Sequence, residues 1–234
     1  MLKNYKNKLF CFSPPVMLAT FLFEFGAAFY TLWRYKLTPI SRLAVVTLLS
    51  LGTFQLTEFM TCGGLGLNHV EWARLGYASI TLLPALGIHL LVIIAHKKRP
   101  FLIGAAYLTC AAFLAFFLFT DGAVSIDACY ANYAVFNTHQ ASIVPYMMYY
   151  YGWLLVGMLL AYRWSIENPK YKKPLMGMTY GYLVFVFPTT FFNIVDPSTT
   201  KAIPSIMCGF AVIFAFILVF YVLPHSSATK KRRP

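Results

Sequence analysis

Long apolar runs separated by short polar connections dominate this chain. Each run has about 20 residues, the length of an α-helix that crosses the hydrocarbon core of a bilayer. Backbone N–H and C=O groups find no water in lipid, so these segments are expected to be helices rather than strands. The sequence therefore predicts an all-α integral membrane bundle of about seven transmembrane helices, over residues 11–33, 43–63, 73–96, 101–120, 146–164, 175–194 and 205–224.

The composition supports a lipid environment. Hydrophobic residues make up 59% of the chain and charged residues 11%, with a mean hydropathy of +0.66, whereas a soluble domain carries about 25% charged residues. We expect a basic N-terminal segment (1–10), a seven-helix domain (11–224) and a basic cytoplasmic tail (225–234). No cleavable signal peptide is expected, because the first apolar run is too long and lacks a small-residue cleavage site.

The basic residues set the expected orientation. The net charge of +12 lies in short clusters between the apolar runs, which argues against nucleic-acid binding on a basic face. Fourteen of the 19 Lys and Arg residues fall on the side of the C-terminal tail, so the positive-inside rule places that tail in the cytoplasm and the N-terminus outside. The expected location is the cell membrane, the inner membrane in a bacterium, with residues 121–145 as one long outer loop.

Two ionisable residues are expected deep in the membrane. Glu24 stands near the middle of the first apolar segment, and His89 lies at a similar depth in the third. Such side chains are costly in lipid unless they are paired, protonated or in contact with water, so both are candidate functional residues. A Glu24–His89 pair would relieve both costs. A structural hydrogen bond, a proton relay and a ligand site remain open as its role.

A second polar group lies in the second segment. Gln55, Glu58 and Cys62 follow one another at offsets of three and four, which places them near one helix face. Glu58 is expected near the outer interface, within reach of water. Arg74, at the outer start of the third segment, is its expected ion-pair partner.

Four of the five cysteines are expected on the outer side, where disulfides form in most cell envelopes. A Cys62–Cys129 disulfide is favoured, because it would hold the long loop over the bundle, and Cys11 and Cys208 are further candidates. Free thiols and a metal site are the alternatives. No paired Cys-x-x-Cys spacing supports a metal, and the sequence indicates no particular cofactor.

Two segments resemble known membrane families. The stretch from Trp72 to Ile93 and residues 203–219 resemble the seven-helix N-terminal sensor region of some bacterial histidine kinases. The matching positions are Trp72, Arg74, Leu75, Leu83 and Pro84. This resemblance implies a sensor fold that acts through a separate partner, since no kinase sequence follows the last segment.

The second resemblance concerns the first two segments. Cys11–Ser13 and Phe54–Phe59 are similar to an uncharacterised bacterial multi-pass membrane family, whose members begin Met-Cys-Phe-Ser and carry Gln-x-x-Glu in the second helix. This family implies a fold but no activity.

Three functions are open at this point. A sensor-like or ligand-binding module acting through a separate partner is favoured. A non-catalytic accessory subunit of a larger membrane complex is the first alternative, and a membrane-embedded, lipid-active enzyme using Glu24, Glu58 or His89 is the second. A non-enzymatic role is preferred. The expected partners are membrane lipids and another membrane protein.

Overall fold

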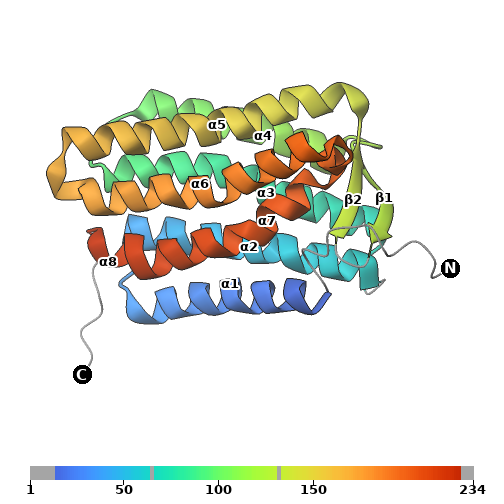
Figure 1. Ribbon diagram of the computed structural model, residues 1–234, viewed down its shortest axis with the longest axis horizontal. Helices are drawn as coiled ribbons and strands as arrows, with labels where there is room; N and C mark the ends of the chain where they lie inside the picture. The colour runs from blue at the N-terminus through green and yellow to red at the C-terminus, as the bar shows by residue number, and fades with distance from the viewer. Residues whose placement is uncertain (1–13, 64–65, 131–132, 228–234) are drawn as a thin grey trace.

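A computed structural model describes residues 14–63, 66–130 and 133–227, and shows an antiparallel bundle of long helices (Figure 1). Each of the seven apolar segments coincides with one long helix. The helices are α1 (Pro14–Arg34), α2 (Pro39–Gly63), α3 (His69–Ile94), α4 (Pro100–Phe119), α5 (Gln140–Glu167), α6 (Lys172–Val195) and α7 (Ile203–Ile217). A π-helical segment η3 (Leu218–Val222) and the short α8 (Leu223–His225) continue α7, and 3₁₀ turns η1 (Pro169–Tyr171) and η2 (Pro197–Ala202) flank α6.

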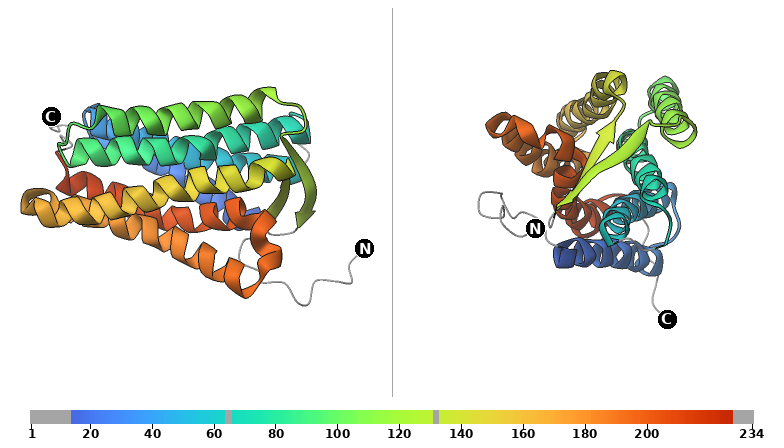
Figure 2. Two further views of the ribbon diagram at one scale, coloured as in Figure 1. Left: turned by 90° about the horizontal axis from the view of Figure 1, so that it is seen from above. Right: turned by 90° about the vertical axis from the view of Figure 1, so that its right-hand side faces the viewer.

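Helix α3 occupies the centre of the bundle, where it contacts α2, α4, α5 and α6. On one side of it, α1, α2 and α7 pack against one another. On the other side α4 packs on α3, and only three of its residues are buried: Ala106, Cys110 and Phe117. Seen end-on, the bundle has α4 at its outer edge and α1 at the opposite edge (Figure 2).

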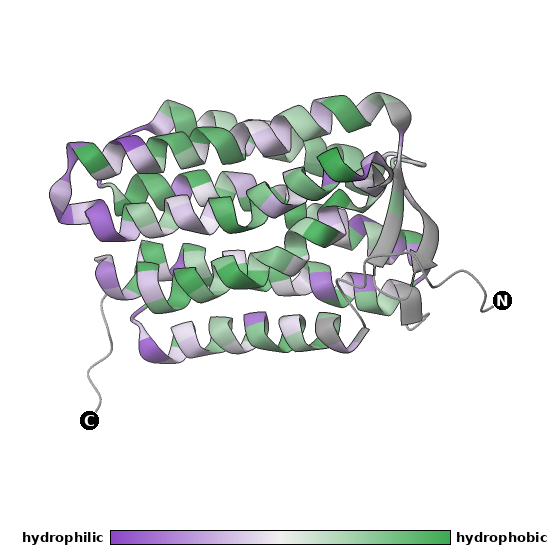
Figure 3. Ribbon diagram, viewed as in Figure 1, coloured by the Kyte–Doolittle hydropathy of each residue, from purple (hydrophilic) through white to green (hydrophobic). Residues whose placement is uncertain are grey.

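The helices are suited to a membrane. Six of them, α2 to α7, are long and apolar enough to cross a bilayer, which indicates a multi-pass membrane protein; α1 is not among these six. Large apolar side chains such as Phe101, Leu108 and Phe187 are exposed, whereas polar side chains such as Glu24 and Gln55 are buried. Hydropathic colouring shows apolar helix middles and polar segments concentrated toward the ends (Figure 3). The protein thus has apolar side chains outside and several polar ones inside.

A β-hairpin occupies the connection that was expected to be an irregular loop. Strands β1 (Val124–Tyr130) and β2 (Tyr133–Thr138) pair antiparallel, with Val124 opposite Thr138 and an irregularity between Ile126 and Ala128. The hairpin lies across one end of the bundle (Figure 2). Phe136 holds it there, because its ring packs on the rings of Phe54 and Tyr77. The all-α prediction therefore holds for the bundle and is wrong for this segment.

Helix α3 begins at a strong cap near the hairpin. The Asn68 side chain accepts a hydrogen bond from the Glu71 backbone, and the Glu71 carboxylate accepts one from the Asn68 N–H, at 2.8 and 3.2 Å. This reciprocal pair satisfies two of the four N–H groups that every helix leaves free at its start. The start of α3 is thereby fixed beside the hairpin.

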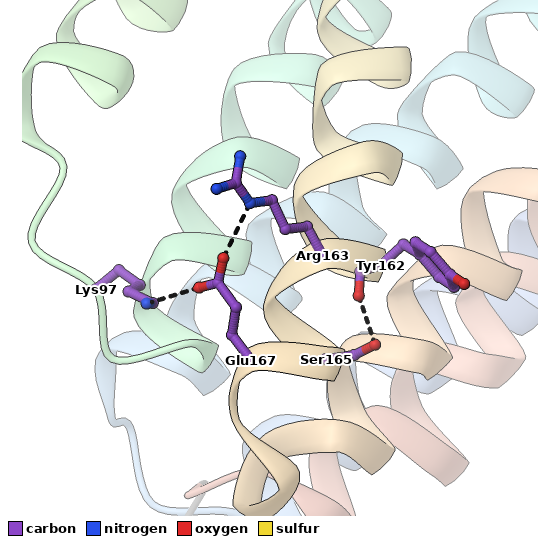
Figure 4. A network of polar contacts seen from close by, with 5 residues as sticks. All are labelled: Lys97, Tyr162, Arg163, Ser165 and Glu167. Carbon is purple, nitrogen blue, oxygen red and sulfur yellow. Dashed lines mark hydrogen bonds and ion pairs between the residues drawn. The ribbon is translucent and has the colours of Figure 1, made fainter.

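An ionic network joins two connections at the opposite end of the bundle. Glu167 accepts from Lys97 at 3.1 Å and from Arg163 at 2.9 Å (Figure 4). Lys97 follows α3, whereas Arg163 and Glu167 belong to the last turns of α5. These partly exposed pairs contribute little stability each, but they connect the end of α3 to the end of α5.

Candidate functional site

A pocket opens between α3, α5, α7 and strand β2, beneath the hairpin. It encloses about 720 Å³ of empty space, its mouth included. Apolar and tyrosine side chains make up nearly the whole wall: Tyr77, Ile80, Phe136, Thr138, Ile143, Tyr146, Met147, Tyr150, Tyr151, Ile203, Pro204, Met207 and Cys208. We call it the hairpin pocket. A wall of this kind suits an apolar molecule oriented by a few hydroxyl groups.

A second, narrower pocket continues deeper into the bundle. Its empty space, including space open to solvent, is about 460 Å³, and it shares Tyr150, Met207 and Cys208 with the hairpin pocket. Tyr182 of α6 enters its wall through a slot between Gly87 and Gly157, where a methyl group on Gly87 would lie 2.5 Å from the Tyr182 hydroxyl. The two glycines therefore make room for this ring.

Hydrogen bonds to one turn of α3 orient two tyrosines of the pocket region. This turn lies directly before Pro84, whose missing N–H leaves the Ile80 carbonyl without its helical donor. The Tyr149 hydroxyl donates to the Thr81 carbonyl at 2.6 Å, and the Cys110 thiol donates to the same oxygen at 3.4 Å. The Thr81 hydroxyl donates to the Tyr77 carbonyl and accepts from Tyr146 at 3.0 Å. Tyr146 and Tyr149 thus face the interior rather than the membrane interface.

A polar cluster lies behind the pocket, between α1, α2 and α7. Glu24 is 0% exposed, Gln55 2% and Glu58 1%. Neither carboxylate oxygen of Glu24 has a hydrogen-bond partner, and neither do Gln55 Nε2 and Glu58 Oε1. The Ser205 hydroxyl forms a side-chain hydrogen bond with Glu58. Three of the four predicted polar residues, Glu24, Gln55 and Glu58, are therefore buried inside the bundle.

Cys208 connects the cluster to the pocket. Its thiol lies in the wall of both pockets, and it interacts electrostatically with the carboxyl groups of Glu58 and Glu24. Ser205 and Cys208 stand one turn apart and share a face of α7. This face contacts Glu58 through Ser205 and borders the pocket through Cys208.

His89 contacts α4 rather than the polar cluster. Its Nδ1 lies 3.1 Å from the Tyr107 hydroxyl, so it ties α3 to α4. No hydrogen bond or ion pair joins it to Glu24, whose carboxylate oxygens are both unpartnered. The predicted Glu24–His89 pair is therefore wrong, and with it the acid and imidazole constellation on which a lipid-active enzyme would depend. The similar depth expected from counting residues is not met either, because Glu24 lies ten residues from the hairpin end of α1 and His89 lies twenty residues from the hairpin end of α3.

The predicted Glu58–Arg74 ion pair is also wrong. Arg74 instead donates to Asp121 at 3.0 Å and to the Thr120 carbonyl at 3.4 Å. Glu58 faces α7 and is buried, rather than lying exposed at the end of the bundle. The connection after α4 brings Asp121 next to Arg74, which spacing along α2 and α3 did not reveal.

The cysteines are described in part. Cys110 and Cys208 are free and buried, so Cys208 is not part of a disulfide. Residue Cys11 and the side chains of Cys62 and Cys129 lie outside the described part of the chain, so the Cys62–Cys129 disulfide stays a prediction. Among the described residues, no group of three His, Cys, Asp or Glu side chains could hold a metal ion.

Sequence reasoning missed Ser205 and Tyr77. Both lie at the hairpin end of apolar helices, and nothing in their local sequence marks them. The alternation of apolar residues at Val124, Ile126 and Ala128 is the signal that could have revealed the strand above them.

No protein-family model, curated protein or solved structure matches the chain. The function is therefore argued from the site alone.

Proposed function

We propose that the protein is a sensor-like membrane module that binds a neutral, largely apolar small molecule in the hairpin pocket. The observation that carries this proposal is the pocket itself: an interior space beneath the hairpin, with a wall of aromatic and aliphatic side chains. None of the described residues that line it is charged, so an ionised ligand would lose its hydration without compensation. The phenol groups of Tyr77, Tyr150 and Tyr151 are the polar groups available to orient a carbonyl or hydroxyl.

The proposed module crosses the membrane seven times. Helix α1 is 21 residues long and packs along α2 and α7, which is enough to span the hydrocarbon core. Seven spans, with Lys and Arg clustered at the end opposite the hairpin, support a topology with the C-terminus in the cytoplasm and the hairpin pocket outside a cell membrane. Modification of a cysteine introduced at Lys98 only from the cytoplasmic side, and of one introduced at Asp121 only from outside, tests this topology; the reverse pattern contradicts it.

Helix α7 is the element that would relay binding to a partner. Its first turns supply Ile203, Met207 and Cys208 to the pocket. The same helix continues through the π-helical segment η3 to the opposite end of the bundle. π-bulges are frequent at functional sites, and this one packs on α6 at Gly177, where a methyl group would lie 2.7 Å from the Tyr221 ring. A shift of the first turns of α7 would therefore reach the cytoplasmic end.

Thermal unfolding of the full chain in detergent tests ligand binding. The probes are a short-chain isoprenoid quinone, monooleoylglycerol and a sterol, each added at increasing concentration. At least one is expected to raise the unfolding midpoint in a saturable manner, because a ligand that binds only the folded state stabilises it. The substitution Ile143→Trp, at the pocket wall, should abolish this shift.

The matched control is Ile213→Trp on α7. Ile213 is 43% exposed on the outer surface of the bundle and does not line the hairpin pocket. This variant should keep the shift of the wild type. Flat responses to all three probes, or an equal loss of the shift in both variants, would contradict the proposal.

An accessory-subunit role is the second candidate, and α4 favours it. This helix packs on α3 and leaves almost its whole surface outward, including Phe101, Leu108 and Phe119. Such a face fits lipid or the helix of another membrane protein. Purification in mild detergent at native expression should then recover a stoichiometric partner that Leu108→Arg releases, whereas a monomeric protein would exclude this role.

A further inference from the structure

Four buried polar side chains form a row along α2 and α1 with open hydrogen-bonding atoms. Thr61 Oγ1, Glu58 Oε1, Gln55 Nε2 and both carboxylate oxygens of Glu24 are buried and have no partner. Other hydroxyls nearby do have a partner. The Thr57 hydroxyl, for example, donates to a carbonyl of its own helix at 2.7 Å. Apart from Arg74 Nε near the start of α3, all the buried side-chain atoms without a partner in the described part of the chain belong to this row.

The row leads from the hairpin end toward the middle of the bundle. Thr61, Glu58 and Gln55 follow at intervals of three residues, so each is next to the following one on the surface of α2, with a rise of about 4.5 Å and a turn of about 60° per step. Glu24 lies against α2 at Gly52, where a methyl group would approach the Glu24 Cβ to 3.4 Å. Side chains tilt toward the N-terminus of their helix, so that of Glu24 leans toward the hairpin end and thus toward Gln55.

The outer end of the row is close to solvent. The Thr61 carbonyl lies 2.9 Å from His69 Nδ1, and His69 is exposed at the start of α3. Successive steps of the row exceed the reach of a direct hydrogen bond. Water molecules between them would satisfy the open atoms, since a buried water bridges two to four polar groups.

Among the residues that the structure describes, no basic side chain forms an ion pair with Glu24 or Glu58. The ion pairs of the described residues lie at the helix ends and involve neither Glu24 nor Glu58. The titratable groups that face them are Cys208 from α7, which interacts with both, and Tyr77 from α3, which interacts with Glu58. Neither carries positive charge, and a carboxylate without a counter-charge is costly in a membrane.

We propose that Glu24 is a proton-binding site, reached from the hairpin end through a hydrated track formed by Thr61, Glu58 and Gln55. A proton from bulk water passes along the bridging waters to a carboxylate oxygen of Glu24, and each step breaks one O–H bond and forms another. Release follows the same route in reverse. The track is separate from the hairpin pocket, so this proposal does not depend on the identity or existence of a pocket ligand.

Infrared spectroscopy of the full chain in detergent tests the proposal, because a protonated carboxylic acid has a C=O stretching band that carboxylates lack. We expect this band at neutral pH, its loss at high pH, and its shift within seconds of mixing with D₂O, since the track exposes the acid proton to bulk water. Glu24→Gln should remove the component with this behaviour. Glu71→Gln, at an exposed acid, should leave it unchanged.

A second pair of variants tests the track. Thr61→Val should slow the D₂O shift at least tenfold, whereas Thr57→Val, one turn away and facing Gly76 of α3, should not. The band of the wild type needs no variant to be interpreted, and its absence at neutral pH, or exchange over hours, would overturn the proposal. Retention of the full band in Glu24→Gln, or equal exchange rates in the two threonine variants, would also overturn it. Loss of the band on adding sodium chloride but not choline chloride would overturn it as well, because this result would assign the site to an alkali cation.

Discussion

At the scale of single residues, the unusual feature is a set of buried polar atoms that form no hydrogen bond with the rest of the protein. A buried donor or acceptor without a partner costs about 1–3 kcal/mol, and Glu24 presents two such oxygens. Nearby hydroxyls avoid this cost by bonding their own helix, as Thr31 does at 2.8 Å to Ala27. A residue that lowers stability in this way is expected where function requires it.

The substitution Glu24→Leu should therefore stabilise the protein. Removing the carboxyl group relieves the cost of its burial, and leucine fills a similar volume beside Gly52. We expect the free energy of unfolding to rise by about 1–3 kcal/mol, measured as a higher unfolding midpoint in detergent. Glu71→Leu, which removes the exposed cap of α3, should lower the midpoint instead. A fall for Glu24→Leu would show that the carboxyl supports the structure.

Tyr149 is the opposite case, because its buried hydroxyl forms a hydrogen bond. It donates at 2.6 Å to the Thr81 carbonyl in the turn before Pro84. Tyr149→Phe should cost about 0.5–1.5 kcal/mol, the usual net value of such a hydrogen bond, whereas Tyr180→Phe, at an exposed position, should cost nothing measurable. Equal unfolding midpoints for the two variants would mean that Thr81 finds another donor.

At the scale of elements, the hairpin and the bundle are joined mainly by packing. Phe136 is buried against Phe54 and Tyr77. The Arg74–Asp121 pair nearby is at the surface, with the Asp121 side chain fully exposed, and exposed pairs contribute little. The ring of Phe136 is therefore expected to decide whether the roof of the hairpin pocket stays closed.

Phe136→Ala should open the hairpin without unfolding the helices. Truncating a buried phenylalanine costs about 3–5 kcal/mol, and here the loss falls on a two-stranded unit that has little stability of its own. Hydrogen exchange should accelerate in β1 and β2 while the middle of α3 stays protected. Asp121→Asn should leave both rates unchanged. Faster exchange throughout α3 would show instead that hairpin and bundle unfold together.

The sequence predicted the helices well and their contacts poorly, for a physical reason. Apolar length identifies a helix that can cross a bilayer, and offsets of three and four correctly placed Gln55 and Glu58 on one face. Neither signal states which neighbour that face meets. Expected positions at the outer ends of the second and third segments suggest Arg74 as the partner of Glu58, whereas Asp121 reaches Arg74 through the connection after α4. The hairpin was missed because its alternating residues lie within a connection that also carries polar and glycine residues.

At the scale of the whole molecule, α7 lies next to two sites of different chemistry. The apolar hairpin pocket and the polar cluster lie against its first turns, with Cys208 in contact with both. Sites that share a wall can influence one another, and any such influence on binding is reciprocal. The proposed ligand and the proposed proton are thus expected to be linked.

The direction of this linkage follows from desolvation. An apolar ligand in the hairpin pocket excludes water from the side of α7 that bears Cys208, which makes the surroundings of Glu24 less polar and favours its neutral, protonated form. Ligand and proton should then bind together, so that affinity is highest at low pH and falls as Glu24 loses its proton.

The measurement is the affinity of the probe that gives the largest thermal shift, taken between about pH 5 and pH 9. Glu24→Gln, which is neutral throughout, should bind with a pH-independent affinity close to the low-pH value of the wild type. A wild-type affinity that rises with pH, or a pH dependence that survives in Glu24→Gln, would show that ligand binding in the hairpin pocket and protonation of Glu24 are independent.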